Sequence, residues 1–146
     1  MGRDSTLTSL LTLTRSYHFS AAHRLWNESF PEERNRALYG KCANDDGHGH
    51  NYHVEVSVTG ECDAESGMLM SRARLDAVVE PLLDQLDHHN INEPLQRAGY
   101  PVSTSEALAA AFWDWLHPTL GDSLYKIRIV ETERNAFEYY GGTLKE

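Results

Sequence analysis

Alternating apolar and polar side chains mark the first long strand of the chain. The odd-numbered positions from residue 11 onwards are mostly apolar, and they include Leu11, Leu13, Tyr17, Phe19 and Ala21. A period of two is typical of a strand with one buried face, and it predicts a strand over residues 8–21 whose parity continues to His23. The same pattern predicts a second strand over residues 48–59, in which His48 and His50 share the apolar face of Tyr52 and the following valines.

Two later stretches have the 3.6-residue period of amphipathic helices. Residues 72–86 carry apolar side chains at 75, 78, 79, 82, 83 and 86, with Ser71 placed to cap the first turn and Pro81 in the interior. The second helix opens at the sequence STSE, in which Ser103 and Glu106 have the spacing of a capping box, and we predict that it ends at Pro118. Its buried stripe consists of Leu108, Phe112, Trp115 and Leu116.

Two short strands, residues 124–132 and 136–141, flank the turn sequence ERN near the end of the chain. Residues 24–47 are polar and rich in turn formers, which predicts a long loop with one helical turn at residues 32–38. The resulting order, ββααββ, predicts an α+β fold in which two helices cover one antiparallel four-stranded sheet. Such a sheet leaves its edge strands unpaired, so we expect the chain to form an oligomer.

Composition limits the classes of partner. A length of 146 residues suits one domain spanning residues 1–146. A net charge of −9 without a run of Lys or Arg argues against nucleic acid and anionic membranes as partners. The two cysteines form no CxxC pair or disulfide framework, which favours a reduced, cytoplasmic protein. The chain lacks an apolar run of about 18 residues and a signal-peptide core, and we treat the N-myristoylation-like opening MGRDST as a chance match.

Histidine is the one unusually frequent residue type, with eight in the chain. His48 and His50 lie two apart on one strand face, so their Cβ atoms are separated by ~6–7 Å and both rings can approach one ion. His23 ends the other strand on its apolar parity and becomes a third ligand if the two strands pair. Three histidines with an open fourth position are typical of a catalytic zinc site.

Three further features leave alternatives open. Cys42 is a fourth metal ligand, a base or nucleophile whose pKa is lowered by nearby positive charge, or an inert turn residue. Asp87 and His88 form either a proton-carrying pair or a histidine that complements the helix macrodipole. Glu131 ends an apolar strand face, where its carboxylate either meets water or recognises a ligand rich in hydrogen-bond donors.

Six ordered blocks of sequence carry a family resemblance. They are FSAAHRL, YGKCANDDGHGHNY, TGECDAESGMLM, LDHHNIN, VSTSEALA and YKIRIVET, and they run from residue 19 to residue 132, which is most of the chain. In order and spacing they resemble the 6-pyruvoyl-tetrahydropterin synthase family, which also includes the 6-carboxytetrahydropterin synthases of the queuosine pathway. The spacing between Cys42 and His48 is similar to that of the pyruvoyl-forming branch. The resemblance implies a tunnelling fold (T-fold), in which three subunits close a barrel and two trimers stack into a homohexamer.

The resemblance also implies roles for particular residues. Zn²⁺ would bind the three histidines and act as a Lewis acid on the side-chain oxygens of 7,8-dihydroneopterin triphosphate. Cys42 would handle protons together with His88, oriented by Asp87, in a group that can meet across a subunit interface. The amino-pyrimidine edge of the pterin would be held by Glu131, helped by two hydroxyls at a helix N-terminus. The residues implied are His23, His48 and His50 for the metal, Cys42, Asp87 and His88 for catalysis, and Glu131, Thr104 and Ser105 for the substrate.

The function expected from this resemblance is conversion of dihydroneopterin triphosphate to 6-pyruvoyl-tetrahydropterin, with elimination of triphosphate, as in tetrahydrobiopterin biosynthesis. The first alternative is 6-carboxy-5,6,7,8-tetrahydropterin synthase, which makes a precursor of queuosine and also releases acetaldehyde. Two further hypotheses are a zinc hydrolase that uses a metal-bound water, for which Cys42 is irrelevant, and a non-catalytic pterin-binding protein that kept the fold.

Overall fold

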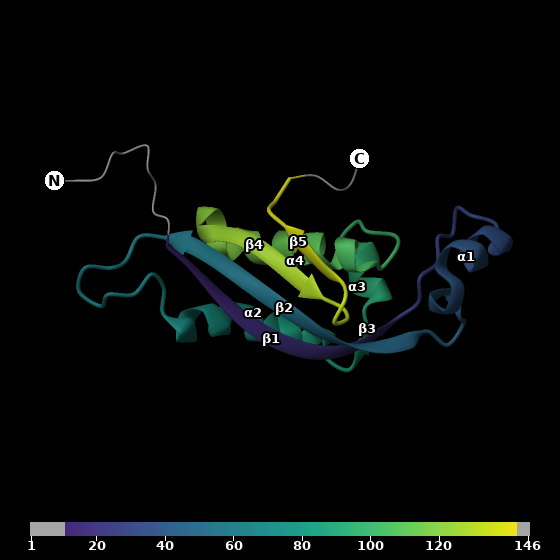
Figure 1. The fold of residues 1–146 in the computed structure, drawn as a ribbon, viewed down its shortest axis with the longest axis horizontal. Coiled ribbons are helices and arrows are strands. Elements are labelled where there is room, and N and C mark those ends of the chain that lie inside the picture. The colour runs from purple at the N-terminus through teal and green to yellow at the C-terminus, as the bar shows by residue number, and fades with distance from the viewer. Residues whose placement is uncertain (1–10, 143–146) are drawn as a thin grey trace.

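The computed structural model describes residues 11–142, in which a long antiparallel ribbon carries helices on one side (Figure 1). The strands are β1 (Leu11–His23), β2 (His48–Gly60), β3 (His89–Asn90), β4 (Leu124–Val130) and β5 (Ala136–Tyr139). The helices are α1 (Glu32–Tyr39), α2 (Arg72–Leu86), α3 (Asn92–Arg97) and α4 (Ser105–Leu120), with short 3-10 helices at Gly40–Ala43 (η1) and Gly121–Ser123 (η2). The fold class is α+β, as predicted. The first residues predicted for β1 and the MGRDST sequence lie outside the described residues.

One mixed sheet organises the chain. β1 and β2 pair antiparallel along their whole length, from Leu11 opposite Gly60 to His23 opposite His48. β4 pairs antiparallel with β2, and β5 with β4. The prediction of a four-stranded, purely antiparallel sheet was wrong, because within residues 11–142 the strand order is β3-β1-β2-β4-β5 and β3 runs parallel to β1.

β3 forms because the chain reverses sharply after α2. His88 adopts the left-handed conformation, with φ of 61°, and its N–H donates to the carbonyl of Ser20 at 2.6 Å. The carboxylate of Asp87 accepts from the N–H of Ser20 at 2.8 Å. These bonds place the next two residues beside β1, and a strand of two residues is too short to leave a periodic pattern in the sequence.

The two long helices were predicted closely, with two errors at α4. α2 has the predicted bounds, and the Ser71 hydroxyl caps it by accepting from the N–H of residue 74. α4 is capped by Thr104 and not by Ser103. It also continues past Pro118 to Leu120, since a proline in the last turn removes only one of the final hydrogen bonds. No helix within residues 11–142 is long and apolar enough to cross a membrane.

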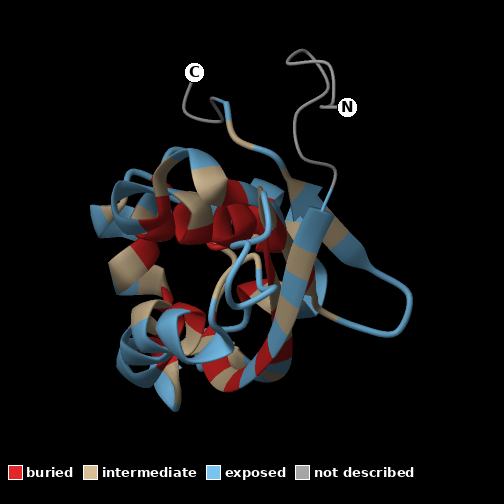
Figure 2. Cartoon of the chain, turned by 90° about the vertical axis from the view of Figure 1, so that its left-hand side faces the viewer, coloured by how far each residue is buried: buried red, intermediate tan, exposed pale blue. Residues whose placement is uncertain are grey.

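The core lies between the sheet and the helices, where the buried segments gather (Figure 2). The odd-numbered residues of β1 and the even-numbered residues of β2 face α2 and α4, and they include Tyr17, Phe19, Ala21, Tyr52, Val54, Val56 and Val58. The alternate residues form a mostly polar face that no helix of residues 11–142 covers, and we call it the open face. Cross-strand contacts on this face join Ser20 to Asn51 and His18 to His53.

A half-buried carboxylate docks α2 on β1. Asp76 accepts two hydrogen bonds from Arg15, at 2.6 and 2.8 Å, and one from the hydroxyl of Tyr17 at 2.7 Å. The bonds from Arg15 and then Tyr17 lower the pKa of Asp76 to about 2. The helix is therefore held in register over the odd-numbered face of the strand.

Candidate metal centre and active site

Three histidines meet at the end of the core face of the sheet. His23 lies directly opposite His48 in the β1–β2 register, and His50 lies opposite the preceding core position of β1. One nitrogen from each ring lies within 4.8 Å of the other two, and Nε2 of His23 is 3.2 Å from Nε2 of His48. The pairing of two strands thus assembles three imidazoles, although His23 and His48 are 25 positions apart in the chain.

A backbone carbonyl fixes the tautomer of His23. Nδ1 of this ring lies 2.7 Å from the carbonyl oxygen of Ser103, and because a carbonyl only accepts, Nδ1 must carry the proton. Nε2 then presents its lone pair toward His48. The pKa of His23 is lowered to about 4, mainly by burial. The pKa of His50 is lowered as well, chiefly by burial and to a smaller extent by the nearby His48. Neutral imidazoles with an oriented lone pair are the form that binds metals.

Two buried nitrogens of the cluster lack hydrogen-bond partners among the described residues. They are Nδ1 of His48 and Nε2 of His50; the nearest carboxylate oxygen to the latter, Oε1 of Glu131, is 3.6 Å away, which is too long for a hydrogen bond. Buried polar atoms without partners are costly and rare. The donor set, its burial and these unpaired nitrogens all fit a zinc ion between the rings.

Gly47 allows the loop before β2 to pass against the end of β1. Its φ is 70°, and a Cβ at this position would lie 2.9 Å from the carbonyl oxygen of His23. Its N–H donates to the carbonyl of Asn44 at 2.9 Å. A residue with a side chain would be strained here in two ways, so this glycine permits the close approach of His23 and His48.

Cys42 lies on η1, close to the cluster but without a ligand position in it. The three-histidine group is formed without the thiol, which is half-buried. Burial raises the pKa of the Cys42 thiol, and the Glu131 carboxylate raises it further. Among the described residues, the charged group that faces the thiol is thus an acid, Glu131, and not a cation.

Glu131 directly follows β4 and faces the same space. Its side chain is 22% exposed, and its carboxylate also contributes to the raised pKa of Tyr52. Glu131 and Cys42 therefore lie with the histidine cluster at one end of the core face. Thr104 and Ser105 follow the carbonyl that binds His23. The Thr104 hydroxyl accepts from the N–H of residue 107, whereas the buried Ser105 hydroxyl has no partner among the described residues.

Among the described residues Asp87 and His88 make no contact with Cys42 or Glu131, although His88 and His50 line one hollow of the surface. Oδ2 of Asp87 is 3.5 Å from Nε2 of His88, whose side chain is 80% exposed. Together with Ser20 and Asn51 they line a hollow, and the side chains of Ser20 and Asn51 lie on the open face. The histidine cluster lies on the opposite, core face of the same sheet.

Two residues that hold the site together had no signal in the sequence. Asn92 binds both backbone polar groups of Arg24 and the hydroxyl of Ser103. The Arg24 side chain binds the loop that carries Cys42. Both residues lie in the blocks LDHHNIN and FSAAHRL, but side chains that bind distant backbone groups leave no periodic or spacing pattern.

Comparison with known proteins gives a consistent picture. The family model described as 6-pyruvoyl tetrahydropterin synthase matches residues 12–142. A Dictyostelium discoideum protein named 6-pyruvoyl tetrahydrobiopterin synthase is 39% identical over 136 residues, covering 92% of this chain and 99% of its own. The Caenorhabditis elegans 6-pyruvoyl tetrahydropterin synthase structure matches with a TM-score of 0.85 at 39% identity, covering 90% of this chain and 96% of that one. A more distant Aquifex aeolicus relative, 26% identical over 157 residues and covering 87% and 96%, is named 6-carboxy-5,6,7,8-tetrahydropterin synthase.

Proposed function

Because the chain belongs to the 6-pyruvoyl tetrahydropterin synthase family, we propose that it converts 7,8-dihydroneopterin triphosphate to 6-pyruvoyl-tetrahydropterin. The observation that carries this proposal is the buried cluster of three histidines beside a thiol and a carboxylate. The reaction eliminates triphosphate and relocates protons between the side chain and the ring, with no net oxidation or reduction. It therefore requires proton carriers and an electrophile, which these groups can provide. The protein is then a lyase that cleaves a carbon–oxygen bond of a phosphate ester.

We propose that Zn²⁺ is held by His23, His48 and His50. When bound, the ion supplies Lewis acidity to the side-chain oxygens of the substrate and favours the thiolate form of a nearby cysteine. The protein contributes the orientation of the ligands: Ser103 fixes the His23 tautomer, and the strand register sets the ring separations. The Ser103 carbonyl and the strand pairing thus orient the three histidines before the ion binds, which favours zinc affinity.

The other residues at this end of the core face bind the pterin and move protons. Cys42 removes a proton from a side-chain carbon of the substrate and returns it elsewhere in the reaction. Glu131 accepts hydrogen bonds from the 2-amino and N3–H groups of the pterin, a donor–donor edge that suits a carboxylate. The unpaired hydroxyl of Ser105, with Thr104 beside it, offers further polar contacts to the ring.

We further propose that a second copy of the chain supplies Asp87 and His88. Within one chain these residues lie on the open face, away from Cys42. Within residues 11–142 the outer side of β1 pairs with β3 at Ala21 and Ala22 alone, which leaves most of that edge available to another subunit, and β5 forms the other edge. Closure of three sheets into a barrel, and stacking of two barrels into a hexamer, would remove these edges.

Product identification tests the reaction. The protein is incubated with dihydroneopterin triphosphate, with and without a chelator, and the products are identified by mass. We expect 6-pyruvoyl-tetrahydropterin and triphosphate, and loss of turnover with the chelator. Acetaldehyde as the main product would instead identify the carboxy branch.

Two variants separate the roles of the thiol and the metal ligands. Cys42→Ala should lose all but a small residual turnover and retain zinc, whereas His50→Ala should lose both turnover and zinc. Near-normal turnover in Cys42→Ala would favour a zinc hydrolase, and pterin binding by a wild type without turnover would favour a binding protein.

Subunit mixing tests the composite site. Cys42→Ala and His88→Ala should each be inactive, and co-assembly of the two should restore part of the activity, because some interfaces then combine an intact thiol with an intact histidine. Failure to regain activity in proven mixed oligomers would contradict the proposal.

We place the protein in the reducing cytoplasm, which is supported by its two free cysteines.

A further inference from the structure

Two hydrogen bonds join the segment that carries Cys42 to the residues that follow His23. The N–H of Leu25 donates to the carbonyl of Cys42 at 2.7 Å, and Nε of Arg24 donates to the carbonyl of Ala43 at 2.9 Å. Ala43 is fully buried, so its carbonyl depends on protein donors. The thiol is therefore tied to the end of the strand that provides one of the clustered histidines.

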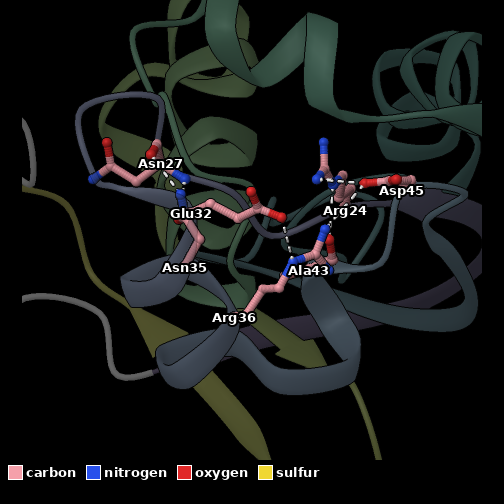
Figure 3. A network of polar contacts seen from close by, with 7 residues as sticks. All are labelled: Arg24, Asn27, Glu32, Asn35, Arg36, Ala43 and Asp45. Carbon is pink, nitrogen blue, oxygen red and sulfur yellow. Dashed lines mark hydrogen bonds and ion pairs between the residues drawn. The ribbon is translucent and has the colours of Figure 1, made fainter.

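The guanidinium of Arg24 is itself held from several sides (Figure 3). Nη2 lies 2.9 Å from the carboxylate of Asp45 while Nε reaches Ala43. The central carbon of the guanidinium lies 3.9 Å from the centroid of the Trp26 ring. Asn92 binds both the backbone N–H and the backbone carbonyl of Arg24. A lysine has neither the fork of donors nor the plane that stacks on the indole, so arginine is specifically suited to this position.

We propose that Arg24 is a positioning residue for Cys42, and that it fixes the thiol relative to the three-histidine cluster through the backbone of η1. The inference rests on the proposed function, since it concerns the alignment of the thiol with the bound pterin. Arg24 makes no hydrogen bond to the thiol within the described residues, and its influence passes through the Ala43 carbonyl. Misplacement of a reacting group by about 1 Å can cost on the order of 100-fold in rate.

Kinetics of Arg24 variants test this role. In Arg24→Gln and Arg24→Lys we expect kcat to fall by about 10- to 100-fold, with KM and zinc content near those of the wild type. Arg36→Gln is the matched control, because Arg36 also approaches Asp45 and Trp26, at 3.6 and 5.6 Å, and within residues 11–142 donates no recorded bond to η1. It should leave kcat near wild type. Full activity in Arg24→Lys would show that charge alone is required and would overturn the proposal.

The dependence on Cys42 provides a second criterion. In a Cys42→Ala background, Arg24→Gln should cause no further loss of residual turnover, because the group that it positions is already absent. An additive further loss would mean that Arg24 acts elsewhere in the reaction and would contradict the inference.

A measurement without turnover keeps the inference separate from the proposed function. Hydrogen exchange of the Leu25 amide and of the η1 amides in the zinc-loaded protein should become about tenfold faster in Arg24→Gln, while β1–β2 amides remain unchanged. Unchanged exchange at these amides, or equal acceleration throughout the sheet, would overturn the positioning role. A wild type that failed to act on dihydroneopterin triphosphate would refute the proposed function and leave this exchange comparison intact.

Discussion

Substitution of Asn92 by alanine tests how much one amide stabilises the site. Its Oδ1 accepts from the N–H of Arg24 at 2.9 Å, and its Nδ2 donates to the Arg24 carbonyl at 2.7 Å and to the Ser103 hydroxyl at 3.0 Å. The side chain thus joins the end of β1, the start of α3 and the segment before α4. Truncation removes all three bonds and leaves both backbone groups of Arg24 without these partners.

The magnitude follows from the number of bonds. At about 1 kcal/mol net for each, with partial access of water to the vacated groups, Asn92→Ala should lower the free energy of unfolding by about 2–4 kcal/mol. For a chain of this size that corresponds to a fall of roughly 10 °C in the melting temperature. Because Ser103 binds His23, the dissociation constant for zinc should also rise, by about tenfold. This is the lower end of the range seen when a metal-binding residue loses its own hydrogen-bond partner, since Asn92 acts on His23 only through Ser103.

Urea denaturation measures the first effect, with EDTA present and at one fixed protein concentration. Competition with a chromophoric chelator measures the second. Asn90→Ala is the control, since its exposed Oδ1 accepts one hydrogen bond, from the N–H of Asn92, and its loss should cost about 1 kcal/mol or less. If the two variants lost equal stability and bound zinc equally well, the linking role of Asn92 would be refuted.

Three further predictions concern the metal cluster, the substrate and the docking of α2. Gly47→Ala should lower stability by about 1–3 kcal/mol in urea denaturation and weaken zinc binding, because the new methyl group meets the backbone of His23 at a positive φ. Glu131→Gln should raise KM for the pterin by about tenfold or more in steady-state assays while zinc content stays unchanged, and a wild-type KM would exclude its role. The bonds from Arg15 hold the pKa of Asp76 at about 2, so stability due to Asp76 is present above its unfolded pKa near 4 and is lost as pH falls from about 4 to about 2. Asp76→Asn should therefore flatten this dependence in metal-free protein, and an unchanged slope would contradict it.

The elements that the sequence predicted well are those with many repeats of one pattern. β1, β2 and α2 each span several periods, so one face is specified repeatedly and the bounds differ from those predicted by few residues. β3 and α3 are too short for such a pattern. Their positions depend on the turn at His88 and on bonds to the neighbouring strand, which are tertiary interactions.

The capping error at α4 has a similar cause. Ser103 and Thr104 are adjacent hydroxyl residues, and local propensity permits either to cap the helix. The structure uses Thr104, because the Ser103 hydroxyl accepts a hydrogen bond from Asn92 and the Ser103 carbonyl accepts one from Nδ1 of His23. The choice between the two is made by residues that lie 11 and 80 positions away, which a local motif does not contain.

The positions of the candidate site residues were easier to predict where many contacts place the group than where few contacts do. The histidines lie on two strands whose register is fixed by thirteen residue pairs, so parity alone predicts that they converge. Among the described residues, two hydrogen bonds join the segment of Cys42 to the end of β1, and Asp87 and His88 lie on the other face of the sheet. It follows that some substitutions should separate zinc binding from proton transfer: those that break the bonds of Arg24 to η1, or that alter the subunit edges, should reduce turnover while the metal remains bound.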